Sequence, residues 1–388
     1  MLWLNQTYQI SGIFGHLAAP GHSYVGALAE KLEGKLPYIT ISLVSLILTL
    51  TLLPFIIRLS HQRGWLDFPS QRKLHKHPTP RLGGLAIFLS CLLAWIIGTA
   101  FWPDLLLGFG RLTLWLLGGA TVIFGLGLWD DFQPVKFRYK ILIESLVGLS
   151  LILAGLRIEL LFIPFWQPVE LGWLSVPVTL LWFLGLLNSI NLIDGLDGLA
   201  GGVSAIAAAT MFIVGIHFKA PVVALLMAGV FTANLGFLKF NRPPAKIFLG
   251  DSGSLFLGYW FAVSSLICPI KSYTALAMFV PLVALAVPVL EAVTSFMRRT
   301  LSLRKFYVPD NQHLYNLLLD LGFSPQRTVL TFYLVSILFS GLSLLLMLTG
   351  RALILPIFSL LIVLALAALA FTYILGTRMR AKHKRIVA

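Results

Sequence analysis

The stretch YITISLVSLILTLTLLPFIIRL, residues 38–59, decides the fold class, because Arg58 is its only charged residue. An α-helix needs about 20 apolar residues to cross the hydrocarbon core of a bilayer. Comparable runs fill most of the chain: 58% of its 388 residues are hydrophobic and 11% are charged. An ordinary soluble enzyme has about 25% charged residues, and a disordered chain has low hydrophobicity, so both classes are excluded.

The apolar runs predict an all-α polytopic membrane protein with about 11 transmembrane helices. The runs lie near 38–59, 83–102, 112–129, 141–157, 173–190, 198–217, 221–238, 253–269, 273–297, 328–349 and 352–375. Residues 1–37 are predicted to be a lead-in, residues 38–376 a single transmembrane domain, and residues 377–388 a basic tail.

Most of the 29 lysines and arginines fall on one set of loops. These loops are 58–82, 130–140, 191–197, 239–252 and 298–327. Because basic residues concentrate in cytoplasmic loops, we expect these loops and the C-terminus in the cytoplasm and the N-terminus outside. The net charge of +14 is then a topology signal in a cytoplasmic membrane protein, and it does not indicate nucleic-acid binding.

The scarce acidic residues fall on the same side as the basic ones. A carboxylate at a helix end within the headgroup zone is costly unless it is paired or binds a cation. Several helix ends at one membrane level carry such a carboxylate, in loops too short to fold separately. The sequence therefore predicts one polar site at the inner membrane surface.

The first polar motif lies at 68–84. It places Lys73, His75 and Arg81 close together and ends in Gly83-Gly84, where backbone can approach closely. Basic side chains beside exposed amides suit a phosphate. The alternative is a basic cytoplasmic loop with no further role.

The second motif contains Asp130-Asp131, with Lys136 and Lys140 following. Neighbouring carboxylates repel, so a cation should neutralise at least one of them. On a helix the two side chains diverge by about 100°, which predicts different roles. Lys136 and Lys140 are four residues apart and would share a helix face. A solvated loop with balancing charges is the alternative.

The third motif repeats a polar residue at every third position in an otherwise apolar run. Its members are Asn188, Asn191, Asp194 and Asp197. Gly195 and Gly198 predict that the helix breaks there and turns polar groups inward to line a cavity. The alternative is a helix–helix interface held together by polar side chains.

The fourth motif places Asp251 between two glycines, with Asn241 and Phe248 before it. An acidic residue at a helix start is typical of an N-cap, and it also suits Mg²⁺, which takes one or two carboxylates together with substrate phosphates. Pure capping is the alternative to metal binding.

The fifth segment is the loop 298–327. Asp310 is predicted to cap a short amphipathic helix whose apolar face is Leu314, Leu317, Leu318 and Leu321. Gly322 should end this helix and Ser324-Pro325 should begin the next one. The segment either connects spans along the membrane surface or brings His313 to the substrate.

Four blocks in this order resemble the polyprenyl-phosphate N-acetylhexosamine-1-phosphate transferase family. The blocks are R-K-x-H-x-x-P-x-P-R-x-G-G, D-D, N-x-x-N-L-I-D-G-L-D-G-L and F-x-G-D-x-G-S, and the resemblance covers about residues 55–330. It implies a phosphoglycosyltransferase that joins a UDP-N-acetylhexosamine to a polyprenyl phosphate and releases UMP. This reaction starts the synthesis of a cell-envelope glycan.

The resemblance also implies roles for single residues. Asp251 and Asn191 would hold Mg²⁺, or Mn²⁺ in its place. Asp130 or Asp131 would orient the acceptor phosphate, and Asp194 and Asp197 would line the nucleotide pocket. The remaining implied nucleotide and phosphate contacts are Lys140, Phe248, Asn188, Asn241, Lys73, Arg81 and His313. The lipid phosphate would meet Lys73, His75 and Lys136.

One block departs from the family. Its members with GlcNAc-type substrates carry His-x-His-His in the fifth loop, where this chain has His313, Tyr315 and Asn316. That departure leaves the sugar open and keeps a non-catalytic, lipid-carrier-binding relative as an alternative. A membrane transporter is the alternative from another class, since intramembrane carboxylates and broken helices also occur there. The prenyl length, the downstream polymer and homodimer formation stay open.

Overall fold

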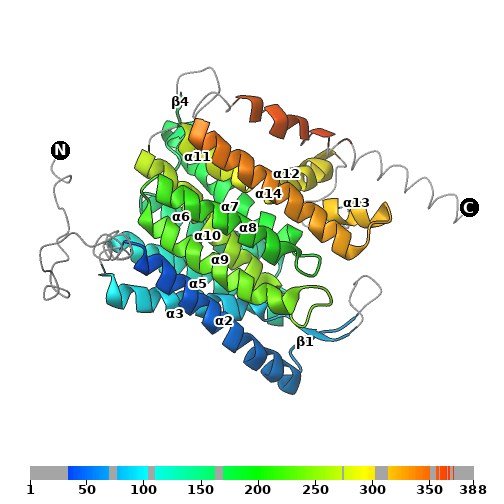
Figure 1. Ribbon diagram of the computed structural model, residues 1–388. Helices are drawn as coiled ribbons and strands as arrows, with labels where there is room; N and C mark the ends of the chain where they lie inside the picture. The colour runs from blue at the N-terminus through cyan, green and yellow to red at the C-terminus, as the bar shows by residue number, and fades with distance from the viewer. Residues whose placement is uncertain are drawn as a thin grey trace, which may run out of the picture.

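The computed structural model describes residues 34–69, 77–103, 110–161, 169–272, 275–301 and 313–349, and short helical pieces between 355 and 370. It is an all-helical bundle with two very short hairpins (Figure 1). The helices are α2 (Leu36–Arg63), α3 (Gly83–Phe101), α5 (Arg111–Phe132), α6 (Phe137–Leu153), α7 (Ser175–Ile193), α8 (Leu199–His217), α9 (Pro221–Asn241), α10 (Gly250–Ser272), α11 (Ala275–Ala284), α12 (Ala286–Leu301), α13 (Leu314–Asp320) and α14 (Pro325–Thr349).

Among the residues that the structure describes, seven helical segments are long and apolar enough to cross a membrane. They are Leu36–Arg63, Gly83–Phe101, Leu112–Phe132, Gly172–Ile193, Leu199–His217, Pro221–Asn241 and Pro325–Thr349. Each coincides with one of the predicted runs, so the polytopic all-α class is confirmed. The total of eleven crossings and the sides of the two termini stay predictions.

The predicted run 273–297 is not one helix. It is divided into α11 and α12, which meet at Leu285. Pro288 lies in the first turn of α12, where its ring and missing N–H oppose continuation of the preceding helix. The interruption gives α12 a separate course toward α7 and α14, both of which it contacts.

The two most enclosed helices are α9 and α10. α9 packs against α8, α2 and α3, while α10 packs against α5, α7 and α3. Large aromatic side chains of α10, including Tyr259 and Trp260, have no solvent exposure. Gly84 of α3 lies directly against Gly253 of α10, since a Cβ on Gly84 would fall 2.1 Å from the Gly253 nitrogen. The first turn of α10 is therefore held at a fixed depth inside the bundle.

One end of the bundle collects most of the polar loops. The hairpin of β1 (Leu66–Asp67) and β2 (Thr79–Pro80) lies at the same end as α13 (Figure 1). The second hairpin, β3 (Leu160–Leu161) with β4 (Val169–Glu170), lies toward the opposite end, before the short helix η1 (Gly172–Leu174).

Candidate functional site

Lys140 joins two of the predicted polar motifs. Its ammonium Nζ lies 2.7 Å from Asp130 Oδ2 at the end of α5 and 2.8 Å from Asp251 Oδ2 at the start of α10. Only 15% of the Lys140 side chain is exposed. A largely buried ammonium between two carboxylates neutralises charges that would otherwise repel each other. The fold thus brings the second and fourth motifs to one point.

Asn191 adds the third motif to this cluster. Its amide Nδ2 donates to Asp251 Oδ1 at 2.9 Å and to the Ser254 hydroxyl oxygen at the same distance. Each oxygen of the Asp251 carboxylate therefore has its own partner: Oδ1 contacts Asn191 and Oδ2 contacts Lys140. We call Asp130, Lys140, Asn191 and Asp251 the acidic cluster.

Asp131 points away from its neighbour and has a different contact. Its Oδ1 accepts from the Asp251 backbone nitrogen at 2.7 Å, and its Oδ2 accepts from the Ser252 nitrogen and hydroxyl at 3.0 and 2.6 Å. The structure does not support pure capping by Asp251, the alternative to metal binding: Asp251 lies inside the first turn of α10, and Asp131 of α5 caps that turn. The predicted divergence of the Asp130 and Asp131 side chains is confirmed.

The predicted break in the third motif is confirmed. α7 ends at Ile193, and α8 begins at Leu199 after Gly198, whose φ of 82° is left-handed. Asp194 caps the end of α7 by position. Burial, followed by repulsion from Asp251 and Asp131, raises the pKa of Asp194 to about 8. The turn 194–198 directly follows the last turn of α7, which carries Asn191, so it lies next to the acidic cluster.

Two predicted nucleotide residues hold this turn to the next loop. Asn241 accepts from the Gly198 nitrogen and donates to the Ile247 carbonyl oxygen, both at 2.8 Å. Asp197 accepts from the Ala245 nitrogen at 2.9 Å. Their described contacts are with backbone, and these contacts fix the shape of the loop that leads to Asp251.

The first motif is attached to the fourth through backbone. The Gly83 and Gly84 nitrogens donate to the carbonyl oxygens of Phe248 and Leu249, and the Phe248 nitrogen donates to Pro80. Arg81 is half exposed, and its Nε lies 3.6 Å from Asp67 Oδ2. Lys73 and His75 lie outside the described residues.

Two carboxylates that sequence analysis did not single out are fully buried. Glu144 of α6 accepts from Asn188 at 2.8 Å. Glu291 of α12 contacts His313 Nδ1 at 2.8 Å. The available signal was a lone acidic residue inside an apolar run, which is costly in a membrane and indicates function.

The fifth segment forms the expected short helix. α13 starts after His313, so this residue occupies the N-cap position and the prediction that Asp310 caps the helix is wrong; Gly322 ends the helix with a φ of 91°. Ser324 accepts from the Arg327 nitrogen at the start of α14, as expected. Leu317 is buried, but Leu321 is exposed and does not extend the apolar face. Asp310 itself lies outside the described residues. In the second motif, the Lys136 side chain is exposed at the residue before α6.

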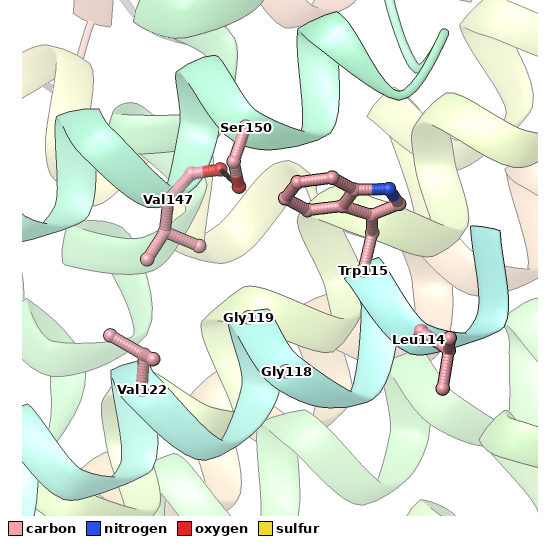
Figure 2. A pocket seen from close by; sticks show the side chains of 7 residues that line it. All are labelled: Leu114, Trp115, Gly118, Gly119, Val122, Val147 and Ser150. Carbon is pink, nitrogen blue, oxygen red and sulfur yellow. Dashed lines mark hydrogen bonds between the residues drawn. The ribbon is translucent and has the colours of Figure 1, made fainter. Parts of the chain in front are cut away.

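An apolar hollow of about 540 Å³ lies between α5 and α6. It is lined by Leu114, Trp115, Gly118, Gly119, Val122, Val147 and Ser150 (Figure 2). None of the acidic cluster lines it. However, the same two helices carry the acidic cluster: Asp130 lies 8 to 16 residues beyond the lining residues of α5, about 12 to 24 Å at 1.5 Å per residue, and Lys140 is on α6.

The acidic cluster has a ligand of the kind that Mg²⁺ takes when it binds together with a phosphate-bearing substrate. Among the described residues, no three His, Cys, Asp or Glu side chains gather into a ready metal cage. Mg²⁺ needs no such cage, because it commonly takes one or two carboxylates and completes its shell with phosphates and water. Asp251, oriented on both oxygens and next to Asp130, supplies a suitable carboxylate.

Comparison with known proteins gives a consistent result. Residues 113–269 match the family described as glycosyl transferase family 4. The chain is 35% identical over 299 residues to the "Probable undecaprenyl-phosphate N-acetylglucosaminyl 1-phosphate transferase" of Bacillus subtilis, covering 77% of this chain and 82% of that protein.

Two further relatives carry related names. The "Decaprenyl-phosphate N-acetylglucosaminephosphotransferase" of Mycobacterium tuberculosis is 30% identical over 359 residues, 85% of this chain and 86% of that protein. The "Phospho-N-acetylmuramoyl-pentapeptide-transferase" of Listeria monocytogenes is 29% identical over 295 residues, 72% of this chain and 88% of that protein.

Proposed function

The chain belongs to glycosyl transferase family 4, and from this premise we propose that it transfers N-acetylglucosamine 1-phosphate from UDP-N-acetylglucosamine to undecaprenyl phosphate. It is a multi-pass membrane phosphoglycosyltransferase, and its relatives act on polyprenyl phosphates in cell-envelope synthesis. The proposed reaction releases UMP on the cytoplasmic face.

The acidic cluster is the observation that supports this proposal. Asp130, Lys140, Asn191 and Asp251 come from four helices and meet within hydrogen-bond distance. A transporter places its substrate and coupling-ion sites near the bilayer midplane, whereas these groups gather at the helix ends. Transfer between two phosphate-bearing substrates needs positioning and charge stabilisation more than covalent help, and such a cluster supplies both.

In the proposed step, an oxygen of the lipid phosphate attacks the β-phosphorus of the UDP-sugar. One phosphorus–oxygen bond forms, and the bond between the β-phosphorus and the bridging oxygen breaks, so that UMP leaves with the electron pair. Asp130 orients the acceptor phosphate and accepts its proton, which leaves that phosphate deprotonated for the attack. Lys140, released from part of its contact with the two carboxylates, holds a phosphate oxygen.

Asp251 is the proposed protein ligand of Mg²⁺. When bound, the ion would neutralise the donor diphosphate and stabilise the charge on the departing UMP. We assign Asn191 to this site together with Asp251, since its amide already fixes one carboxylate oxygen. Mn²⁺ has similar ligand preferences and is expected to substitute.

The isoprenoid chain of the acceptor is proposed to lie along the hollow between α5 and α6. The helices that line the hollow also carry Asp130 and Lys140. Gly119 and Trp115 lie within about 60° of Asp130 around the α5 axis, at 100° per residue. A lipid whose phosphate is bound by the acidic cluster would thus follow the same face of the helix pair.

The test is a turnover assay with purified protein in lipid nanodiscs. The expected result is UMP release from UDP-N-acetylglucosamine that requires both undecaprenyl phosphate and Mg²⁺, with the lipid product identified by mass. A panel of other UDP-sugars tests the choice of sugar. Solute uptake by proteoliposomes with no turnover of any UDP-N-acetylhexosamine would favour a transporter, and lipid binding without turnover would favour a non-catalytic relative.

A further inference from the structure

Glu291 of α12 is completely buried and accepts three hydrogen bonds. Its Oε1 lies 2.8 Å from His313 Nδ1 and 3.2 Å from the Ser295 hydroxyl, and its Oε2 accepts from the Leu314 nitrogen at 3.0 Å. An ionisable side chain buried in a membrane helix is costly and is usually retained for function. This one links α12 to the first residue of α13.

The contact with Glu291 determines which nitrogen of His313 carries a proton. A carboxylate offers only acceptors, so Nδ1 must donate. With Nδ1 protonated, a neutral imidazole has its lone pair on Nε2, and a charged one has a second donor there. Glu291 therefore leaves Nε2 as the nitrogen that is available to another group.

His313 is fixed from its other side by Tyr315. The two rings are parallel, with centroids 5.5 Å apart and an angle of 5° between their planes. The Tyr315 hydroxyl lies against Gly195, where a Cβ would fall 2.0 Å from the hydroxyl oxygen. Gly195 belongs to the turn 194–198, next to the acidic cluster. The stacked His313 and Tyr315 rings therefore lie between the Glu291 carboxylate and this turn.

We propose that Glu291 is a positioning residue for the transfer reaction. It fixes the orientation and the tautomer of His313, so that Nε2 is offered to the phosphate groups of the donor, while Tyr315 keeps the ring against the turn 194–198. This role rests on the proposed function in one respect, which is that the donor is a UDP-sugar. The hydrogen-bonded arrangement itself is independent of that identity.

The test combines Glu291→Gln, His313→Gln and the double variant. Glutamine has one acceptor oxygen where Glu291 uses two, so either His313 or Leu314 loses its partner. We expect kcat/KM for UDP-N-acetylglucosamine to fall about 10- to 100-fold, as when the partner that orients a metal-binding imidazole is removed. The KM for undecaprenyl phosphate should stay unchanged. The double variant should be no worse than His313→Gln alone, because interacting residues are not additive.

A control variant is Ser343→Ala, which removes a buried hydrogen bond between α14 and the Val280 carbonyl oxygen far from His313 in the bundle. Its kinetics should match those of the unaltered protein. Two results would overturn the proposal. One is a double variant whose loss of kcat/KM is the product of the two single losses. The other is a loss of folded protein in Glu291→Gln that accounts for its lower activity, since Glu291 would then contribute to stability alone.

A second readout does not depend on turnover. In protein labelled with ¹⁵N-histidine, the His313 signals are those missing from His313→Gln. We expect a protonated Nδ1 in the unaltered protein and a changed tautomer balance in Glu291→Gln. A proton on Nε2 alone in the unaltered protein would refute the positioning role, even if the protein turned over no UDP-sugar.

Discussion

The carboxylate of Asp131 caps a helix that begins 119 residues later, by accepting from both the nitrogen and the hydroxyl of Ser252. The amides at a helix start have no partner within their own helix. In a buried helix start, a carboxylate from a neighbouring helix can satisfy them without water. Asp131 therefore sets the place of α10, and with it the place of the neighbouring Asp251 side chain.

Substitutions of Asp131 and Asp130 should affect different properties, stability for Asp131 and turnover for Asp130. Asp131→Asn replaces one acceptor oxygen by an amide that cannot accept, and an unsatisfied buried N–H costs about 1–3 kcal/mol. We expect a lower Tm in detergent for this variant. Asp130→Asn should abolish UMP release with a smaller change in Tm. Equal loss of Tm in both variants would contradict the division of roles.

Lys140→Gln should reduce turnover by at least about 100-fold, the effect of removing one preorganised charged donor from an active site. The substitution leaves Asp130 and Asp251 without the ammonium that lies between them. The matched control is Arg138→Gln on the same helix, where the exposed guanidinium contacts only Tyr139 among the described contacts. If Arg138→Gln lost as much activity, general charge at this surface would explain both results.

Gly84→Ala should destabilise the protein strongly. The added Cβ would lie 2.1 Å from backbone of Gly253 and cannot be relieved by a side-chain rotation. Overpacking of this kind costs about 1–3 kcal/mol or more, so we expect a lower Tm and a lower yield of folded protein. Gly341→Ala in α14 has open space around the Cβ and should cause no loss.

Filling the hollow between α5 and α6 tests the path of the isoprenoid chain. Gly118→Leu adds a side chain to open space beside Trp115 and should raise the KM for undecaprenyl phosphate. The KM for a short-chain prenyl phosphate should stay unchanged in this variant. Gly125→Leu is the control, since Gly125 is exposed on the same helix outside the hollow. An unchanged KM for the long lipid would place the chain elsewhere.

Chelation of divalent cations should stop turnover, and added Mg²⁺ or Mn²⁺ should restore it. A cation that binds only the folded protein raises its stability by mass action. We therefore also expect Mg²⁺ to raise the Tm of the unaltered protein and to leave the Tm of Asp251→Asn unchanged. A Mg²⁺-dependent Tm that persists in Asp251→Asn would assign the ion to other ligands.

The sequence predicted much of the local structure because local rules govern it. Apolar runs of sufficient length predicted the helices, and Gly195 and Gly198 predicted the break between α7 and α8. The division near Leu285 was missed, because hydropathy alone does not register the proline that follows it. The cap supplied to α10 by Asp131 was missed as well, since a partner on a distant helix leaves no local signal.

The sequence by itself determined the membrane class, the approximate helices and the polar motifs, because hydrophobicity and glycine content act over a few residues. Only the tertiary structure decided that Lys140 joins Asp130 to Asp251, that Asp131 serves α10, and that Glu291 holds His313. These contacts join residues 10 to 121 positions apart. Their geometry depends on how whole helices pack, and that packing is set by contacts such as those between Gly84 and Gly253.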